Sequence, residues 1–337
     1  MPEVRPVVAV TLGDPASIGP EVVVKALAGG ELGAVCVPVV VGDRRVVARA
    51  LATTGAVLEV VPVERPGAAT GKAGRVEVVD VPAYGIDAID WGRVQAPAGR
   101  AAYESIVVAI DLALAGEVDA VATAPVSKEA LRAAGVSQIG HTEIFAERTG
   151  TLEPLTLFET RGLRIFFLTR HLSLAEALRQ VTAARVLATL RGAAAALRTL
   201  GVAAPRIAVA ALNPHGGEHG LFGDEEEKEL VPAVLRAREE GIDASGPLPA
   251  DSVFWHAAHG RFDAVLSLYH DQGHVAAKMY DFERTVSMTC GLPFLRTSVD
   301  HGTAFDLAGT GRASATSMEE AIRAAARHAF AVRGRTA

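Results

Sequence analysis

Three histidines each follow a segment that is typical of a buried strand. His171 lies in the stretch LTRH, His215 in NPHGGE and His270 in YHDQGH. A lone histidine is more often structural than a ligand, but three at the ends of strands favour a divalent-metal site. Imidazole suits zinc, cobalt or nickel, and three protein ligands leave positions open for substrate oxygens. The three are far apart in the sequence, so their convergence is a hypothesis that the metal content of a His215→Ala protein tests.

Two further groups of residues could bind an anion. In GHTE, His141 and Thr142 precede a helix-like stretch, and a hydroxyl with free amides at a helix start suits a phosphate or carboxylate. A simple N-cap by Thr142 is the alternative. Lys278 and Arg284 could be solvated cations on a helix, whereas Arg296 follows the apolar run LPFL in a loop rich in glycine and hydroxyl groups. Arg296 is therefore the stronger candidate for anion binding.

The segment after the first expected strand, residues 11–21, reads TLGDPASIGPE. Gly13 and Gly19 permit tight turns, and Pro20 suits the first turn of a helix. Asp14 either belongs to an ordinary strand-to-helix connection or lies on the floor of an active site, and the sequence leaves both open. No GxGxxG motif and no P-loop lysine motif appears, so a standard Rossmann dinucleotide site is not supported.

Buried strands alternate with helices along the chain, which predicts a largely parallel sheet covered on both faces. Ligands of such sheets bind beyond the carboxyl ends of the strands, where the histidines lie. The strands are expected at Val7–Leu12, Val35–Val41, Val118–Ala122, Arg164–Leu168, Arg206–Ala211 and Asp263–Leu268. Helices are expected at Ala101–Ala115, Ala184–Leu200 and Asp224–Glu239, and an exposed loop at Arg65–Arg75.

The composition excludes several classes of protein. The 337 residues are 50% hydrophobic and carry a net charge of -6, which makes the chain a poor candidate for binding nucleic acid. Cys36 and Cys290 imply no disulfide framework. The first apolar run is short and enters a Gly-Asp-Pro turn, so we expect a strand there and no signal peptide. No apolar stretch of about 18 residues predicts a membrane span. We expect a soluble, cytoplasmic protein.

The ordered motifs resemble the 4-hydroxythreonine-4-phosphate dehydrogenase family. They are GDP (13–15), GHTE (140–143), NPHGGE (213–218), GPLPAD (246–251), YHDQG (269–273) and RTSVDHGT (296–303), and the similarity continues to Gly309. HGTA is also similar to the corresponding loop of isopropylmalate and isocitrate dehydrogenases. The resemblance implies an α/β fold of the isocitrate/isopropylmalate dehydrogenase-like type, with two α/β domains and a cleft between them, which binds NAD without the Rossmann motif. Residues 1–130 plus 275–337 would form the terminal, cofactor-side domain and residues 131–274 the central domain.

The resemblance also implies roles for individual residues. The ligands of one divalent metal (Zn, Co, Mg or Mn) would be His171, His215 and His270, with the active site in the cleft and shared across a homodimer interface. The contacts to an anionic small-molecule substrate would be His141, Thr142, Lys278, Ser287 and Arg296. Lys278, with Asp251, would be the catalytic acid and base. NAD, or NADP as the alternative, would lie near Asp300, His301, Gly302 and Thr303.

The implied reaction is oxidation and decarboxylation of a 3-hydroxy acid 4-phosphate such as 4-phosphooxy-L-threonine, in pyridoxine biosynthesis. The metal would polarise the alcohol and then the ketone. Three positions depart from the family pattern: Ser287 replaces an asparagine, Ser17 a glycine and His274 an apolar residue. His274 is similar to branches that oxidise D-threonate or D-erythronate 4-phosphate, and another relative acts on a terephthalate cis-dihydrodiol. These substrates are alternatives.

Two alternative hypotheses for the function remain. The chain could be a non-catalytic protein that binds a metal or small molecule, or it could be a phosphate acyltransferase. Retention of Lys278, Asp251 and the histidines argues against the first. The second would not need three histidine ligands.

Overall fold

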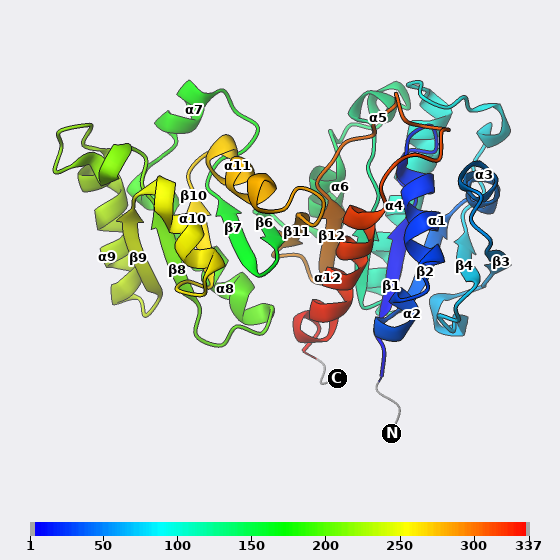
Figure 1. The fold of residues 1–337 in the computed structure, drawn as a ribbon, viewed down its shortest axis with the longest axis horizontal. Coiled ribbons are helices and arrows are strands. Elements are labelled where there is room, and N and C mark those ends of the chain that lie inside the picture. The colour runs from blue at the N-terminus through cyan, green and yellow to red at the C-terminus, as the bar shows by residue number, and fades with distance from the viewer. Residues whose placement is uncertain (1–3, 335–337) are drawn as a thin grey trace. The chain divides into compact units, whose positions relative to one another are not determined.

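The chain divides into two compact units in its computed structural model, which describes residues 4–334 (Figure 1). Unit 1 runs from the N-terminus to Pro154 and from Leu292 to the C-terminus, and unit 2 covers Leu155–Gly291. Within the described residues, no helix is long and apolar enough to cross a membrane.

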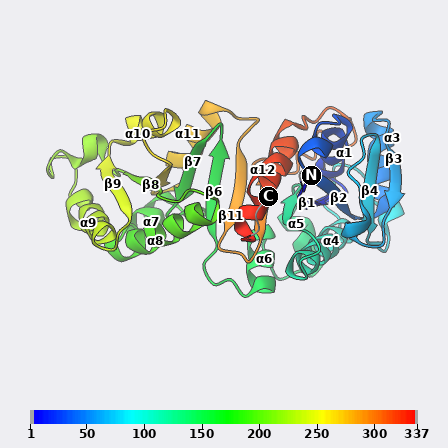
Figure 2. The same ribbon diagram turned by 90° about the horizontal axis from the view of Figure 1, so that it is seen from below.

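Unit 1 contains a parallel sheet whose strands are nearly all apolar. In order across the sheet they are β3 (Glu59–Pro62), β4 (Arg75–Asp80), β2 (Val37–Gly42), β1 (Val7–Thr11), β5 (Ala120–Thr123) and β12 (Leu295–Val299). Its helices are α1 (Gly19–Ala28), α2 (Leu32–Val35), α3 (Arg44–Thr54), α4 (Ala96–Leu114), α5 (Lys128–Ala133), α6 (His141–Thr149) and α12 (Thr316–Val332), with short turns η1 (Pro66–Ala68) and η2 (Ile86–Ala88). Helices α1 and α12 lie on one face and α4 on the other, so the central strands are buried on both sides (Figure 2).

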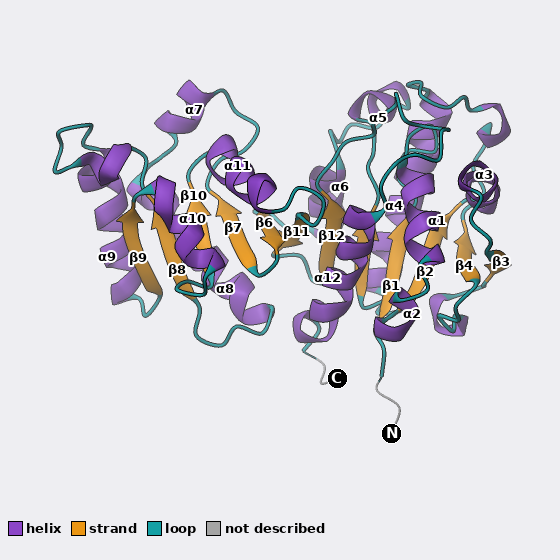
Figure 3. Ribbon diagram, in the orientation of Figure 1, coloured by secondary structure: helices purple, strands orange, loops and turns teal. Residues whose placement is uncertain are grey.

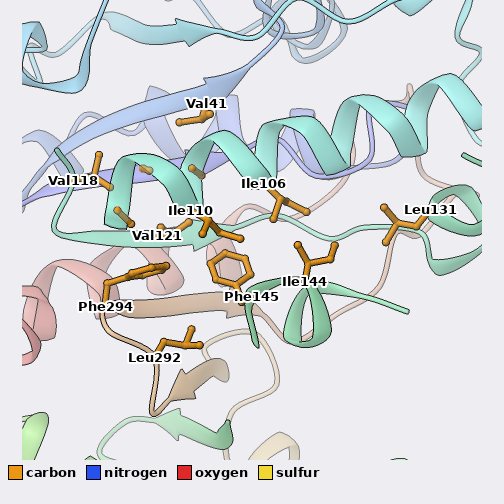
Figure 4. Packing of buried hydrophobic residues seen from close by; sticks show 13 residues of the cluster. Val41, Ile106, Ile110, Val118, Val121, Leu131, Ile144, Phe145, Leu292 and Phe294 are labelled. Carbon is orange, nitrogen blue, oxygen red and sulfur yellow. The ribbon is translucent and has the colours of Figure 1, made fainter. Parts of the chain in front are cut away.

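A hydrophobic core of unit 1 lies between α4, α5, α6 and the sheet (Figure 4). Ile106 and Ile110 of α4 and Phe145 of α6 are fully buried there. The rings of Phe145 and Phe294 meet edge to face, with centroids 6.0 Å apart. This packing joins residues 131–154 to unit 1.

Unit 2 contains a mixed sheet. In order across it, the strands are β11 (Val286–Cys290), β6 (Leu155–Thr160), β7 (Leu163–Phe167), β10 (Ala264–Ser267), β8 (Arg206–Ala210) and β9 (Asp243–Leu248). The pairs β11–β6 and β6–β7 are antiparallel, whereas β7, β10, β8 and β9 run parallel. The β6–β7 hairpin turns at Arg161 and Gly162, which both have positive φ, as a two-residue hairpin turn requires.

Helices cover both faces of this sheet as well (Figures 2 and 3). They are α7 (Leu174–Arg179), α8 (Ala183–Thr199), α9 (Val231–Glu239), α10 (Ala250–Ala258) and α11 (His270–Tyr280), with a 3₁₀ turn η3 (Pro214–Gly217) and a π-helical turn η4 (Glu226–Leu230). Ala277 of α11 and Phe254 of α10 pack against Phe158 and Phe167 of the sheet.

The predicted strands and helices are present, with ends that shift by a few residues. The first predicted helix begins earlier, at Ala96, because a proline occupies its first turn. The helix expected at Asp224–Glu239 is a π-helical turn followed by α9, at the point where Pro232 removes a backbone donor. The stretch Arg65–Arg75 contains η1 and is mostly exposed.

The unit boundaries lie at 154/155 and 291/292, whereas the sequence placed them at 130/131 and 274/275. The difference has a packing reason. Leu131 and Phe145 belong to the core around α4, and Ala277 belongs to the core of unit 2. Residues 131–154 therefore go with unit 1, and residues 275–291 with unit 2.

Candidate active site

Two of the predicted metal ligands lie together at the carboxyl ends of neighbouring strands in unit 2. His171 follows β7 and His270 begins α11 directly after β10, and the centroids of their rings are 6.1 Å apart. Backbone contacts hold the two strand ends in register, since the Leu168 N–H donates to the Ser267 carbonyl at 2.8 Å. A pocket of about 270 Å³ is lined by Arg170, His171, Leu172, Leu174, Ala177, Tyr269, His270 and Asp271.

The His270 ring is oriented by a carboxylate. Its Nδ1 lies 2.7 Å from Oδ1 of Asp271, which leaves Nε2 as the nitrogen available to a ligand. Gln272 fixes the start of the same helix, because its Oε1 accepts from the Leu268 N–H and its Nε2 donates to the Ala211 carbonyl, both at 2.8 Å. An imidazole with a carboxylate behind it is the usual arrangement of a metal-binding histidine.

His274 lies one turn further along α11 and packs on His270. Their rings are stacked with centroids 3.6 Å apart, and the centroid of the His274 ring also lies 4.4 Å from that of Phe158 and 4.9 Å from that of Phe167. Burial, followed by the charges of His270, Lys278 and His171, lowers the pKa of His274 to about 3. The His274 imidazole is therefore uncharged at neutral pH.

The third predicted ligand, His215, lies in η3 after β8 and is exposed. Within residues 4–334, no group of three or more His, Cys, Asp or Glu side chains is arranged to hold a metal ion. The structure thus brings His171 and His270 together, but one chain does not complete the three-histidine set. The imidazole donors, one with a carboxylate behind it, are chemically suited to a divalent transition metal.

The other residues predicted in unit 2 lie on three elements. Lys278, on α11, is half-buried, and its Nζ lies 5.4 Å from the centroid of the Phe282 ring. Ser287 is half-buried in β11, and Asp251 is exposed in the first turn of α10.

In unit 1, the half-buried His141 lies within the electrostatic influence of the buried Arg296. His141 is the first residue of α6, and its Nε2 is buried without a hydrogen-bond partner. Burial and the nearby charge of Arg296 lower the pKa of His141 well below its usual value. Helix α6 is capped by Gly140 with no side-chain cap, so the alternative that Thr142 is its N-cap is wrong. The uncharged ring presents an unused nitrogen beside a cation.

Arg296 lies in strand β12 and is 4% exposed, so the expectation that it belongs to a loop is wrong. Its Nε and Nη2 donate to Oγ1 of Thr123 at 3.2 and 2.8 Å, and its guanidinium carbon lies 5.5 Å from the centroid of the Phe145 ring. These contacts orient the guanidinium at the carboxyl ends of β5 and β12.

The sequence left open whether Asp14 belongs to an ordinary strand-to-helix connection or to the floor of an active site. In the structure it is a buried carboxylate. It has no exposed surface; its Oδ1 accepts from the Ala16 N–H at 2.8 Å, and its Oδ2 has no partner. Burial, opposed by that hydrogen bond, raises its pKa to about 6. The Ser17 hydroxyl donates to the Asp14 carbonyl at 2.8 Å and so stabilises the turn where the family usually has glycine. An unused, partly protonated oxygen at the end of β1 favours a functional role.

The predicted cofactor segment Asp300–Thr303 follows β12, and Thr303 accepts a hydrogen bond from the Ile18 N–H at 3.2 Å. The loop after it is held by Glu21, a residue that sequence reasoning missed. Glu21 is fully buried and accepts from the N–H groups of Gly309 (2.5 Å) and Gly311 (2.7 Å). Those donors lie nearly 290 residues away, so no local pattern could have indicated the contact.

The chain matches the family model described as "Pyridoxal phosphate biosynthetic protein PdxA" over residues 34–325. It is 62% identical over 331 residues to a protein of Symbiobacterium thermophilum named "Putative D-threonate 4-phosphate dehydrogenase", covering 98% of this chain and 99% of that one. A protein of the same name from Halalkalibacterium halodurans is 53% identical over 325 residues, covering 96% and 97%.

Solved structures of dehydrogenases also match this chain. The 4-hydroxythreonine-4-phosphate dehydrogenase of Klebsiella pneumoniae matches with a TM-score of 0.91 and 42% identity over 98% of this chain and 99% of that one. A terephthalate 1,2-cis-dihydrodiol dehydrogenase of Burkholderia xenovorans matches with a TM-score of 0.64 and 31% identity, over 98% and 99%. The EutD phosphotransacetylase of Staphylococcus aureus, at a TM-score of 0.53 and 12% identity, shares the fold alone.

The predicted isocitrate/isopropylmalate dehydrogenase-like α/β fold class and the predicted family are therefore confirmed. The family match spans most of the chain, and the relatives that carry dehydrogenase names are covered almost completely. The chain belongs to the PdxA family and is a dehydrogenase.

Proposed function

We propose that this dehydrogenase oxidises D-threonate 4-phosphate at carbon 3 with NAD and a divalent metal, and releases carbon 1 as carbon dioxide. The observation that carries the proposal is the 62% identity, over nearly both full lengths, to a relative named for this substrate. The position of His274 supports it, since this residue stacks on the candidate ligand His270. The alternative, 4-phosphooxy-L-threonine, draws its support from relatives at 42% identity.

The two substrates differ at carbon 2, which bears a hydroxyl in D-threonate 4-phosphate and an ammonium in 4-phosphooxy-L-threonine. Helix α11 carries His270, His274 and Lys278, and burial, followed by the charges of His270, Lys278 and His171, disfavours protonation of His274. A substrate ammonium beside these groups would be repelled, whereas a hydroxyl can exchange hydrogen bonds with a neutral imidazole.

We assign the phosphate or acid group of the substrate to His141, Thr142 and Arg296. The buried Arg296 guanidinium supplies positive charge, and the unpartnered Nε2 of the neutral His141 ring can donate to an anion in the tautomer that protonates it. Ser287 and Lys278 complete the proposed substrate contacts.

His171, His215 and His270 would hold the metal, which acts when bound as a Lewis acid on the alcohol oxygen. We further propose that a homodimer shares this site, as the family resemblance implies. The Asp300–Thr303 segment would contact NAD.

The reaction balances with one proton-transfer group on the protein. Lys278 would accept the proton of the carbon 3 hydroxyl, and NAD, when bound, would supply the acceptor for the hydrogen that leaves carbon 3 with its electron pair. The bond between carbons 1 and 2 then breaks, carbon dioxide leaves, and its electron pair forms the enolate double bond. Lys278, with Asp251 as the second candidate, returns a proton to carbon 2. The product is dihydroxyacetone phosphate.

A substrate panel tests the proposal. The purified protein is supplied with Zn²⁺ or Co²⁺ and either NAD or NADP. It is then assayed for reduced cofactor and carbon dioxide with D-threonate 4-phosphate, D-erythronate 4-phosphate, 4-phosphooxy-L-threonine and a terephthalate cis-dihydrodiol. We expect the highest kcat/KM with D-threonate 4-phosphate and NAD. Faster turnover of 4-phosphooxy-L-threonine would transfer the assignment to that substrate, and faster turnover of the diol would refute the phosphate contacts.

A further inference from the structure

The first residues of the loop that carries His215 are hydrogen-bonded to a buried carboxylate, that of Glu226. Glu226 is 2% exposed and lies in the π-helical turn η4. Its Oε1 accepts from the backbone N–H groups of Leu212 at 2.8 Å and Asn213 at 2.7 Å, and its Oε2 accepts from Nδ2 of Asn213 at 2.8 Å. One carboxylate therefore receives three N–H groups from the two residues that lead from β8 into the His215 loop.

Glycines close the loop around that carboxylate. A Cβ on Gly217 would lie 2.9 Å from Oε2 of Glu226, and a Cβ on Gly223 would lie 2.5 Å from Nδ2 of Asn213. The N–H of Phe222 donates back to the Gly217 carbonyl at 3.1 Å. The loop is thus a compact structure built against Glu226, and its shape depends on where that carboxylate lies.

The backbone at His215 is in a conformation that needs outside support. Its φ is 55°, and Glu218 and His219 also have positive φ, at 45° and 56°. A non-glycine residue in this region is strained and persists only where the surrounding structure imposes it. The hydrogen bonds to Glu226 come from Leu212 and Asn213, three and two residues before His215, so they are placed to supply that support.

We propose that Glu226 is a positioning residue that fixes the location and direction of the His215 imidazole. Glu226 is not itself a candidate ligand, because both of its oxygens are buried and accept hydrogen bonds. The inference rests on the proposed function, in which His215 binds the metal. It adds that the metal affinity of this site depends on a carboxylate that never contacts the ion.

The test compares Glu226→Ala and Glu226→Gln with Glu229→Ala in the full-length protein. Glu229 lies in the same π-helical turn but accepts from the N–H of Ala183, at 2.6 Å, so its removal leaves the His215 loop intact. Metal-free protein is titrated with Co²⁺ by calorimetry, and the visible Co²⁺ spectrum reports the ligand set. Backbone amide exchange at Leu212 and Asn213 reports the loop without metal.

We expect Glu226→Ala to weaken Co²⁺ binding about 10- to 100-fold and to speed exchange of the Leu212 and Asn213 amides. Glu226→Gln should have a smaller effect, because its one carbonyl oxygen can still accept from both backbone N–H groups. Glu229→Ala should leave Co²⁺ affinity unchanged. In a His215→Ala background, Glu226→Ala should cause no further loss, since it acts through that ring.

Unchanged Co²⁺ affinity in Glu226→Ala, where His215→Ala does weaken binding, overturns the positioning role alone. An equal loss from Glu226→Ala with and without His215 also overturns it, because the effect would then be general destabilisation. If His215→Ala itself leaves Co²⁺ affinity unchanged, the proposed metal ligand fails, and the inference falls with it.

Discussion

Asp14 gives the sharpest prediction about stability. Its carboxyl is fully buried, Oδ2 has no partner, and its pKa is raised to about 6 by burial. Asp14→Asn retains an Oδ1 that accepts from the Ala16 N–H and removes the ionisable group. We expect this substitution to stabilise unit 1 at neutral and alkaline pH, although it alters a buried polar residue.

The size and sign follow from proton linkage. The folded state binds the Asp14 proton more tightly than the unfolded chain, whose pKa is near 3.8. Burial of Asp14 therefore carries no ionisation cost below about pH 4, and the free energy of unfolding falls as the pH rises through 6. A shift of about two pKa units corresponds to about 3 kcal/mol once the carboxylate is fully ionised. Asp14→Asn should remove that cost.

Tryptophan fluorescence can follow unit 1 alone. The chain has two tryptophans. Trp91 lies in unit 1, whereas Trp255 is exposed on α10 of unit 2, so a Trp255→Phe background leaves one reporter. Urea unfolding of Asp14→Asn in that background should match the parent at pH 4 and exceed it by about 3 kcal/mol at pH 8.

Asp306→Asn, at an exposed position of unit 1, is the matched control for the loss of one negative charge. If Asp14→Asn changes the free energy of unfolding by the same amount at pH 4 and pH 8, the raised pKa is not the cause and the reasoning is refuted. If the variant is more stable yet loses activity, the buried carboxylate is retained for function at the expense of stability.

Two further predictions concern unit 1. Phe145→Ala should lower the free energy of unfolding by about 3 to 5 kcal/mol, because it empties a fully buried site between α4 and Phe294. Urea unfolding followed by Trp91 fluorescence measures this loss, and a loss below about 1 kcal/mol would contradict the packing. Glu21→Gln leaves one oxygen to accept from two loop N–H groups, so the KM for NAD should rise about tenfold with kcat little changed. An unchanged KM would mean that the Gly309–Gly311 loop does not position the cofactor.

The elements predicted best from the sequence are strands that consist of continuous apolar runs. Strand β1 (VVAVT) and strand β2 (VPVVVG) are apolar runs buried on both faces, so their type follows from local composition. Strand β12 was missed because Arg296 interrupts it. A buried arginine is tolerated there because Thr123, 173 residues away, accepts from it, and no local signal reveals such a partner.

The predictions for the site likewise divide into those that a sequence pattern could support and those that it could not. The rule that ligands lie beyond the carboxyl ends of parallel strands placed His171 and His270 together, since β7 and β10 are neighbours. His215 follows β8, which also pairs with β10, yet its side chain is directed by a loop with three non-glycine residues at positive φ. The edge of the sheet at which the histidines lie could therefore be predicted from sequence, whereas the order of the strands and the direction of a side chain on an unusual loop could not.

Buried acids explain why these loops hold their shapes. Glu21, Glu226 and Asp14 are each at most 2% exposed, and each accepts backbone N–H groups from a loop at the carboxyl end of a strand. Two of the proposed metal ligands, His171 and His215, are exposed, and His270 and Lys278 are half-buried. We therefore expect a substitution at His274, which is half-buried and stacks on His270, to alter substrate preference without moving the loops. This separation gives a physical reason why relatives with one fold can carry the names of different substrates.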